Sequence, residues 1–314
     1  MPPPKTIPPR LGARAYWDAF KGSIYHVGEN NLALISAGVA FFAMLSLFPA
    51  LAALIALLGL VSEPAVVVSQ LQEMRPFMPN DVYEILNDQV VSLVTTSTGT
   101  LGWAGLVSLL VALWSARAGV GAMITGLNAV YREKDRNTAK HYFRALMLTV
   151  MLVGVGIVAL LMLVVIPVML TFVPMGPVST MVIEAVRWAI AVGVLFAGIG
   201  VLYRFGPNRK AARLPWLSVG AVVAVAAWAI LSIGFSFYVA NFGNYNQIYG
   251  SIGAVIAMLI WLWISSFLVL YGAALNAQIE MRTKPDSTVG PDRPPGQRGA
   301  FAADTIIEPG REVT

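Results

Sequence analysis

Long apolar runs separated by short polar stretches dominate this chain. One of these runs extends from Ile252 to Leu275 and contains no Asp, Glu, Lys or Arg over more than twenty residues. A helix of that length rises about 1.5 Å per residue and is long enough to cross a hydrocarbon core about 30 Å thick. Six such segments predict six membrane-spanning helices over residues 32–61, 101–130, 145–172, 180–203, 215–239 and 249–279.

The first polar stretches predict helices of a different kind. From Ala13 to Val27, apolar residues recur at helical spacing, which predicts an amphipathic helix. Such a helix can lie in the membrane interface or pack on the protein's own rim, and the pattern favours neither.

Pro49 interrupts the first span, so we expect a bend near residues 46–49. Between Ser62 and Thr100, Pro76 and Pro79 separate two short helices, the second with an apolar stripe, which predicts a helical hairpin between spans one and two.

The two ends of the chain have the composition of unstructured segments. Residues 1–12 are rich in proline and predict a flexible N-terminus. Residues 282–314 are rich in proline, glycine and charge, which predicts a disordered tail. The sequence therefore predicts a single six-span membrane domain over residues 13–281.

Composition supports a membrane protein and excludes several kinds of site. Hydrophobic residues make up 57% of the chain and charged residues 12%, which leaves more apolar surface than a soluble protein of 314 residues can bury. The fold class is therefore all-α, as a polytopic membrane protein. The absence of cysteine excludes disulfides and thiolate chemistry.

The distribution of charge predicts the orientation in the membrane. Apart from Arg117 and Arg187, which lie inside predicted spans, eighteen of nineteen Lys and Arg residues fall in the two termini and in the loops around residues 132–144 and 204–213. Positively charged loops remain on the cytoplasmic side. We expect both termini and both basic loops on the cytoplasmic side of the membrane and the hairpin on the opposite side.

Five polar residues in or near the spans are candidates for a substrate path: Arg117, Glu184, Arg187, Asn128 and Asn276. An ionised arginine near the bilayer centre is costly unless it faces protein or water. In the functional interpretation, Arg117 lines a hydrated cavity for an anionic headgroup with help from Glu184, Arg187 and Asn128. In the structural alternative, Arg117 bonds to carbonyl groups inside the bundle while Glu184 and Arg187 reach interface water. For Asn276, a hydrogen bond between helices is favoured over a ligand contact.

Catalytic chemistry has little support in the sequence. His26 and His141 lie in different segments, at predicted cytoplasmic edges and without neighbouring carboxylates in a metal-binding pattern. No glycine-rich phosphate loop occurs. We therefore expect no enzyme activity, no cofactor, no metal site and no nucleic-acid partner.

Four stretches fall in an order that resembles one family: LALISAGVAFFAMLSLFPAL, LVALWSARAGVGAMITGLNAVY, LYRFGP and YGSIGAVIAMLIWLWISSFLVLYGAALNA. This order resembles the YihY/BrkB family of bacterial inner-membrane proteins, formerly mislabelled ribonuclease BN. The resemblance covers about residues 12–281. It implies six spans in the bacterial inner membrane, with both termini in the cytoplasm and the hairpin therefore in the periplasm. Ala274 departs from the family, whose members usually have a glutamate in GAELNA at this position.

The resemblance implies roles in envelope integrity and in the export or flipping of lipids. Combined with the residues above, it favours a transporter or flippase-like protein for lipids or another amphipathic envelope component. The alternative is a non-catalytic scaffold that organises envelope protein partners, and a ribonuclease is the least favoured interpretation. Membrane lipids are the expected partners in either of the first two cases.

Overall fold

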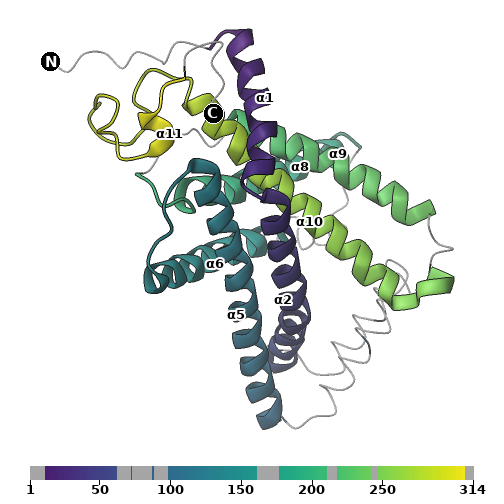
Figure 1. Cartoon of the computed structure of the whole chain (residues 1–314). Helices are drawn as coiled ribbons and strands as arrows, with labels where there is room; N and C mark the ends of the chain where they lie inside the picture. The colour runs from purple at the N-terminus through teal and green to yellow at the C-terminus, as the bar shows by residue number, and fades with distance from the viewer. Residues whose placement is uncertain are drawn as a thin grey trace. The chain divides into compact units, whose positions relative to one another are not determined.

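The computed structural model describes residues 11–61, 98–160, 177–210, 218–241 and 246–307, with positions 72 and 87 in isolation. Regular secondary structure in these ranges consists of helices, which confirms the all-α class. Figure 1 shows them as α1 (Ala13–Glu29), α2 (Leu32–Val61), α5 (Thr98–Tyr131), α6 (Thr138–Leu160), α8 (Pro177–Phe205), α9 (Val219–Asn241), α10 (Asn246–Glu280) and α11 (Phe301–Asp304).

Six of these helices are long and apolar enough to cross a membrane, which confirms the predicted number of spans. The segments that qualify are Leu32–Ala50, Gly105–Tyr131, Thr138–Ala159, Met181–Phe205, Val219–Tyr238 and Gly253–Glu280. Large apolar side chains project outward from them, for example Ile230 and Ile233 of α9, which are 72% and 73% exposed. Apolar surface of this kind requires lipid as its solvent.

Some predicted features can be compared directly with the helices. Helix α6 begins at Thr138, seven residues before the predicted start of span three, where the Asn137 side chain accepts the Lys140 backbone N–H at 3.0 Å. Helix α2 continues through Pro49 as one element. The predicted hairpin between residues 62 and 97 lies outside the described ranges.

The chain divides into two compact units, where the sequence predicts one membrane domain. Unit 1 comprises Met1–Ala37, Val120–Phe235 and Trp263–Thr314, and unit 2 comprises Gly38–Gly119 and Ser236–Leu262. The boundaries fall inside α2, α5, α9 and α10, so each of these long helices contributes one part to each unit.

Close contact between α9 and α10 organises the interior of unit 1. Gly220 and Gly272 face each other, and a Cβ atom added to Gly220 would overlap the Gly272 carbonyl oxygen. Residues without large side chains allow two helix backbones to approach this closely in a membrane. The following residues of α10, Ala273, Ala274 and Ala277, are buried.

Small residues in α5 serve the same purpose. In unit 2, a Cβ atom on Gly119 would lie 3.4 Å from the Phe42 Cβ of α2. In unit 1, Gly121 packs against His141 of α6. An adjacent core of Ile124, Ala145 and Leu148 joins α5 to α6.

Helix α1 packs on the protein, which is one of the two alternatives that its pattern allows. Ala19, Ser23 and His26 are buried, and the Ser23 hydroxyl lies 3.3 Å from the Tyr271 hydroxyl of α10. Trp17 and Ile24, however, are exposed. The helix therefore packs on the protein along one face and presents an aromatic and aliphatic face outward.

The C-terminal segment, defined here as residues 282–307, differs from the predicted disordered tail. Three buried or hydrogen-bonded polar side chains hold it together. Asp286 accepts the Thr288 backbone N–H at 2.8 Å, Asp304 accepts the Arg298 backbone N–H at 2.8 Å, and the Arg298 guanidinium donates to the Ala303 carbonyl at 2.7 Å. The segment folds through side-chain-to-backbone hydrogen bonds, which its low apolar content does not reveal.

The Gly220–Gly272 contact predicts a strong position dependence for glycine substitutions in α9. Gly220→Ala forces a methyl group onto backbone atoms, so we expect the free energy of unfolding to fall by about 1–3 kcal/mol. Gly234→Ala in the same helix is the matched control, because nothing lies within 4 Å of its added Cβ. Thermal unfolding in detergent, followed by far-ultraviolet circular dichroism, measures both. Equal stability of the two variants would contradict the close approach.

Candidate functional site

Arg117 lies in α5, within unit 2, and its side chain is half-buried. Its Cζ atom lies 4.9 Å from the centre of the Trp114 ring, one turn earlier in the same helix. A guanidinium over an indole face gains a favourable cation–π interaction, which offsets part of the cost of placing the charge in an apolar span. Arg117 is therefore a cation in the middle of the span Gly105–Tyr131.

The two predicted residues of α8 lie in unit 1. Arg187 is half-buried, and its Cζ atom lies 5.9 Å from the centre of the Trp188 ring. Glu184 belongs to the helix, but its side chain lies outside the described part of the structure. The ion pair expected between Glu184 and Arg187 therefore stays a prediction, as does their cooperation with Arg117.

Asn128 ties together the two basic loops of unit 1. It is buried, its amide nitrogen donates to the Asp135 carboxylate at 2.7 Å, and its amide oxygen accepts the Asn208 backbone N–H at 2.7 Å. These contacts account for both ends of the side-chain amide. The position of Asn128 therefore indicates a structural role in unit 1.

Asn276 caps the start of α9. Its side-chain oxygen accepts the Gly220 backbone N–H at 2.8 Å, and its nitrogen donates to the Ser218 hydroxyl at 2.8 Å. Ser218 in turn accepts the Ala221 backbone N–H at 3.2 Å. The first N–H groups of a helix have no partner within the helix, so these contacts satisfy them at the α9–α10 contact. Asn276 thus makes the hydrogen bond between helices that the sequence favours.

A buried ion pair joins the loop after α8 to the end of α10. The Arg209 guanidinium donates to the two Glu280 carboxylate oxygens at 2.7 and 2.5 Å, and both side chains are only 3% exposed. The Tyr131 ring lies 4.9 Å from the Arg209 Cζ atom, and the Ser287 hydroxyl donates to Glu280. Burial opposes the charge on Arg209, but the hydrogen bonds and charge of Glu280 raise its pKa above the usual value.

Sequence reasoning missed this pair. The only available signal is Glu280 itself, a carboxylate at the end of an apolar span and beside a basic part of the chain. Its partner is 71 residues away, and several other basic residues are equally plausible from position alone. The three-dimensional fold, and not the local sequence, determines that Arg209 is the partner of Glu280.

His26 occupies a second polar cluster, between α1 and the loop after α5. Its Nδ1 atom lies 2.9 Å from Glu29, and its Nε2 atom lies 3.3 Å from the Arg132 guanidinium. Because arginine can only donate, Nε2 accepts and the Nδ1–H donates to Glu29, which defines a neutral imidazole. Burial lowers the pKa of His26, and the charges of Arg132 and Arg282 act in the same direction against the opposing effect of Glu29.

These clusters connect loops and helix ends to one another. Within the described ranges, no three His, Asp or Glu side chains gather closely enough to hold a metal ion. The contacts described above in unit 1 are hydrogen bonds and ion pairs among the protein's own groups, and Arg117 supplies a cation within a span of unit 2.

Comparison with known proteins places the chain among bacterial membrane proteins. The family described as "Virulence factor BrkB" matches residues 23–297. A "Putative ribonuclease-like protein YfkH" of Bacillus subtilis is 31% identical over 276 residues, which cover 85% of this chain and 95% of that protein. A UPF0761 membrane protein of Alteromonas mediterranea is 26% identical over 267 residues, which cover 83% of this chain and 87% of the relative. No solved structure matches the chain.

The buried ion pair predicts a large penalty for removing one partner. Glu280→Gln leaves the Arg209 charge buried without its counter-ion, and we expect the free energy of unfolding to fall by about 3–5 kcal/mol. The matched control is Glu29→Gln, because Glu29 is partly exposed, lies 3.9 Å from Arg132 and accepts the His26 Nδ1–H, which a glutamine carbonyl can also accept. Its loss should therefore cost about 1 kcal/mol or less. Thermal unfolding in detergent distinguishes the two, and similar losses would contradict a dominant role for the pair.

The His26 cluster predicts that acid loosens α1. The lowered pKa means that the folded state binds the proton less well than the unfolded chain, whose histidine has a pKa of about 6.5. The stabilisation is therefore present above about pH 6.5 and declines as the pH falls below that value. Hydrogen exchange of the α1 amides, corrected for intrinsic rates, should show reduced protection at pH 5.5 relative to pH 7.5. His26→Gln should remove this difference, and a difference that persists in that variant would refute the mechanism.

Proposed function

This chain belongs to the family of the virulence factor BrkB, and from that premise we propose that it is a transporter, of the flippase type, for lipids or another amphipathic component of the bacterial envelope. It is an integral membrane protein with six apolar helices. The single observation that carries the proposal is Arg117, a half-buried cation inside the span Gly105–Tyr131.

Arginine in a span suits the transport of an anionic headgroup. A charged side chain in the bilayer interior is costly, and such residues commonly mark a path for a polar substrate. The guanidinium fork matches the geometry of a phosphate group better than the point charge of a lysine does. Contact with Trp114 stabilises the cation within the span.

The proposal includes an orientation. The basic loops after α5 and α8 belong to the cytoplasmic side by the positive-inside rule, together with both termini, and the protein resides in the inner membrane. Membrane lipids are the partners, no nucleic acid is involved, and the proposal contains no catalytic step. Arg187 and Glu184 of α8 remain candidates for the same path.

One observation favours a second function, a scaffold for an envelope complex. The C-terminal segment is folded outside the six spans, where it can meet envelope protein partners. Its exposed Arg293 and Phe301 lie on a framework fixed by Asp286 and Asp304. A scaffold would not transport lipid as an isolated protein.

Reconstitution in vesicles tests the proposed transport. Wild-type protein in phosphatidylglycerol-containing vesicles should move a fluorescent phosphatidylglycerol between leaflets, measured by chemical quenching of the outer leaflet. Arg117→Ala should lower that rate at least about tenfold, because the cation that meets the phosphate is gone. The matched control, Arg14→Ala, removes an exposed arginine outside the spans and should leave the rate unchanged.

Circular dichroism and gel filtration verify that the variants remain folded. If the wild type moves lipid and Arg117→Ala moves it at the same rate, Arg117 has no role in the mechanism. A folded wild-type protein that moves no lipid would refute the transporter and favour the scaffold.

A further inference from the structure

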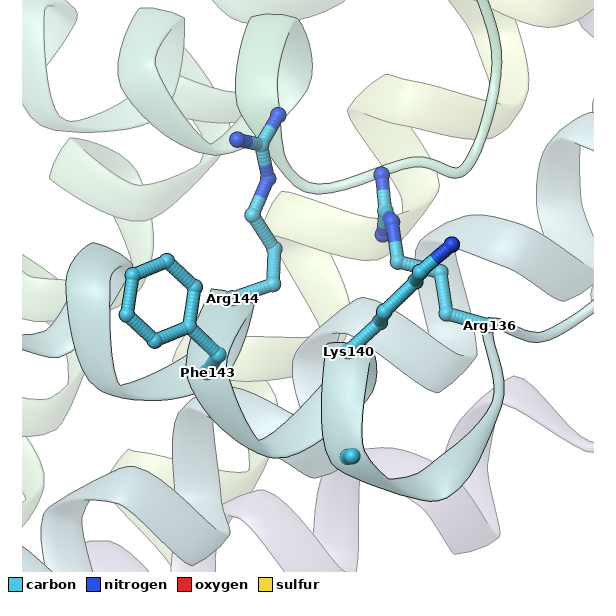
Figure 2. A pocket seen from close by; sticks show the side chains of 5 residues that line it. Arg136, Lys140, Phe143 and Arg144 are labelled. Atoms are coloured by element: carbon cyan, nitrogen blue, oxygen red, sulfur yellow. The ribbon is translucent and has the colours of Figure 1, made fainter.

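A hollow of about 480 Å³ opens at the start of α6, within unit 1. Figure 2 shows Arg136, Lys140, Phe143 and Arg144 around it, and Ala139 completes the described lining. All five lining residues are basic or apolar. This composition complements a ligand that joins an anionic group to an apolar part.

Helical spacing brings the positive charges together. Lys140 and Arg144 are four residues apart in α6 and therefore lie on the same face, and Arg136 comes from the segment just before the helix. Figure 2 shows their charged ends extending to the same side. The start of α6 adds the partial positive charge of a helix N-terminus, where Asn137 caps the Lys140 N–H.

The two arginines are held in place by the end of α8. Arg136 donates to the carbonyls of Gly206 and Pro207 at 2.9 and 2.8 Å, and Arg144 donates to the Phe205 carbonyl at 2.8 Å. A guanidinium has five N–H donors, so these contacts use only part of each group. The arginines are thus fixed in position while they still present positive charge to the hollow.

The depth of the hollow favours a lipid over a soluble anion. The apolar span of α6 begins at Thr138, so the hollow lies where an apolar span meets its polar flank, at headgroup depth. Phe143 is 65% exposed, and Leu146, Met147 and Val150 continue an exposed apolar surface along the helix. Acyl chains can follow this surface while a headgroup occupies the hollow.

We propose that this hollow binds the phosphate of an anionic phospholipid, held by Arg136, Lys140 and Arg144, with the acyl chains along α6. The residues that line the hollow belong to unit 1 and Arg117 belongs to unit 2, and the binding does not depend on transport. Juxtamembrane basic residues attract anionic lipid, and clustering three of them around a hollow converts a diffuse attraction into a defined site.

Native mass spectrometry of the full-length protein in detergent tests this site. The protein is titrated with phosphatidylglycerol, with phosphatidylcholine and with inorganic phosphate. We expect phosphatidylglycerol to bind at least about fivefold more tightly than phosphatidylcholine, and Lys140→Glu to weaken phosphatidylglycerol binding about tenfold. Lys140→Glu should fold, because the Lys140 side chain is exposed and an acidic residue is favourable in the first turn of a helix.

The matched control is Lys134→Glu, which reverses an exposed charge in the loop before α6 that does not line the hollow, and should change phosphatidylglycerol affinity less than about twofold. Equal effects of the two variants would show diffuse attraction and overturn the site. Inorganic phosphate that binds as tightly as the lipid would overturn a lipid occupant. If Arg117→Ala loses transport but still binds phosphatidylglycerol as the wild type does, the lipid site is separate from the proposed transport function.

Discussion

The buried ion pair between Arg209 and Glu280 is the contact on which the packing of loops and helix ends in unit 1 depends. It fixes the loop after α8 to the end of α10, and the Tyr131 ring brings the end of α5 against the same guanidinium. Removing two charges from water is costly, so the pair is stable only because the carboxylate receives both guanidinium N–H groups and the Ser287 hydroxyl. This one pair of side chains therefore connects the ends of three helices and the C-terminal segment to one another.

A second constraint acts at the start of α9 and at the end of α8. Backbone groups that lack a partner within the helix must find one where water is scarce. Asn276 supplies it at the start of α9, and Arg136 and Arg144 supply it at the end of α8. The same two arginines line the hollow of Figure 2, so the cations of the proposed lipid site are positioned by a structural requirement of the neighbouring helix.

The features that could be predicted from sequence are those that depend on one segment at a time. Span number follows from the length of apolar runs, and the role of Asn276 follows from an amide in an apolar helix that needs a partner. The Arg209–Glu280 pair joins residues far apart in the chain, so no local pattern identifies it. The C-terminal segment was predicted to be disordered because apolar content is low, whereas its order comes from Asp286, Arg298 and Asp304 bonding to backbone groups.

Because that segment is folded, the folded part of the protein extends past Met281 to Ile307. Phe301 donates its backbone N–H to Glu133 at 2.8 Å, and the Lys210 N–H donates to the Gly299 carbonyl at 3.2 Å. A truncation after Met281, chosen on composition alone, would strip partners from the loops that follow α5 and α8. An affinity tag or fluorescent fusion therefore belongs beyond Ile307, because the chain up to that residue is part of the folded protein.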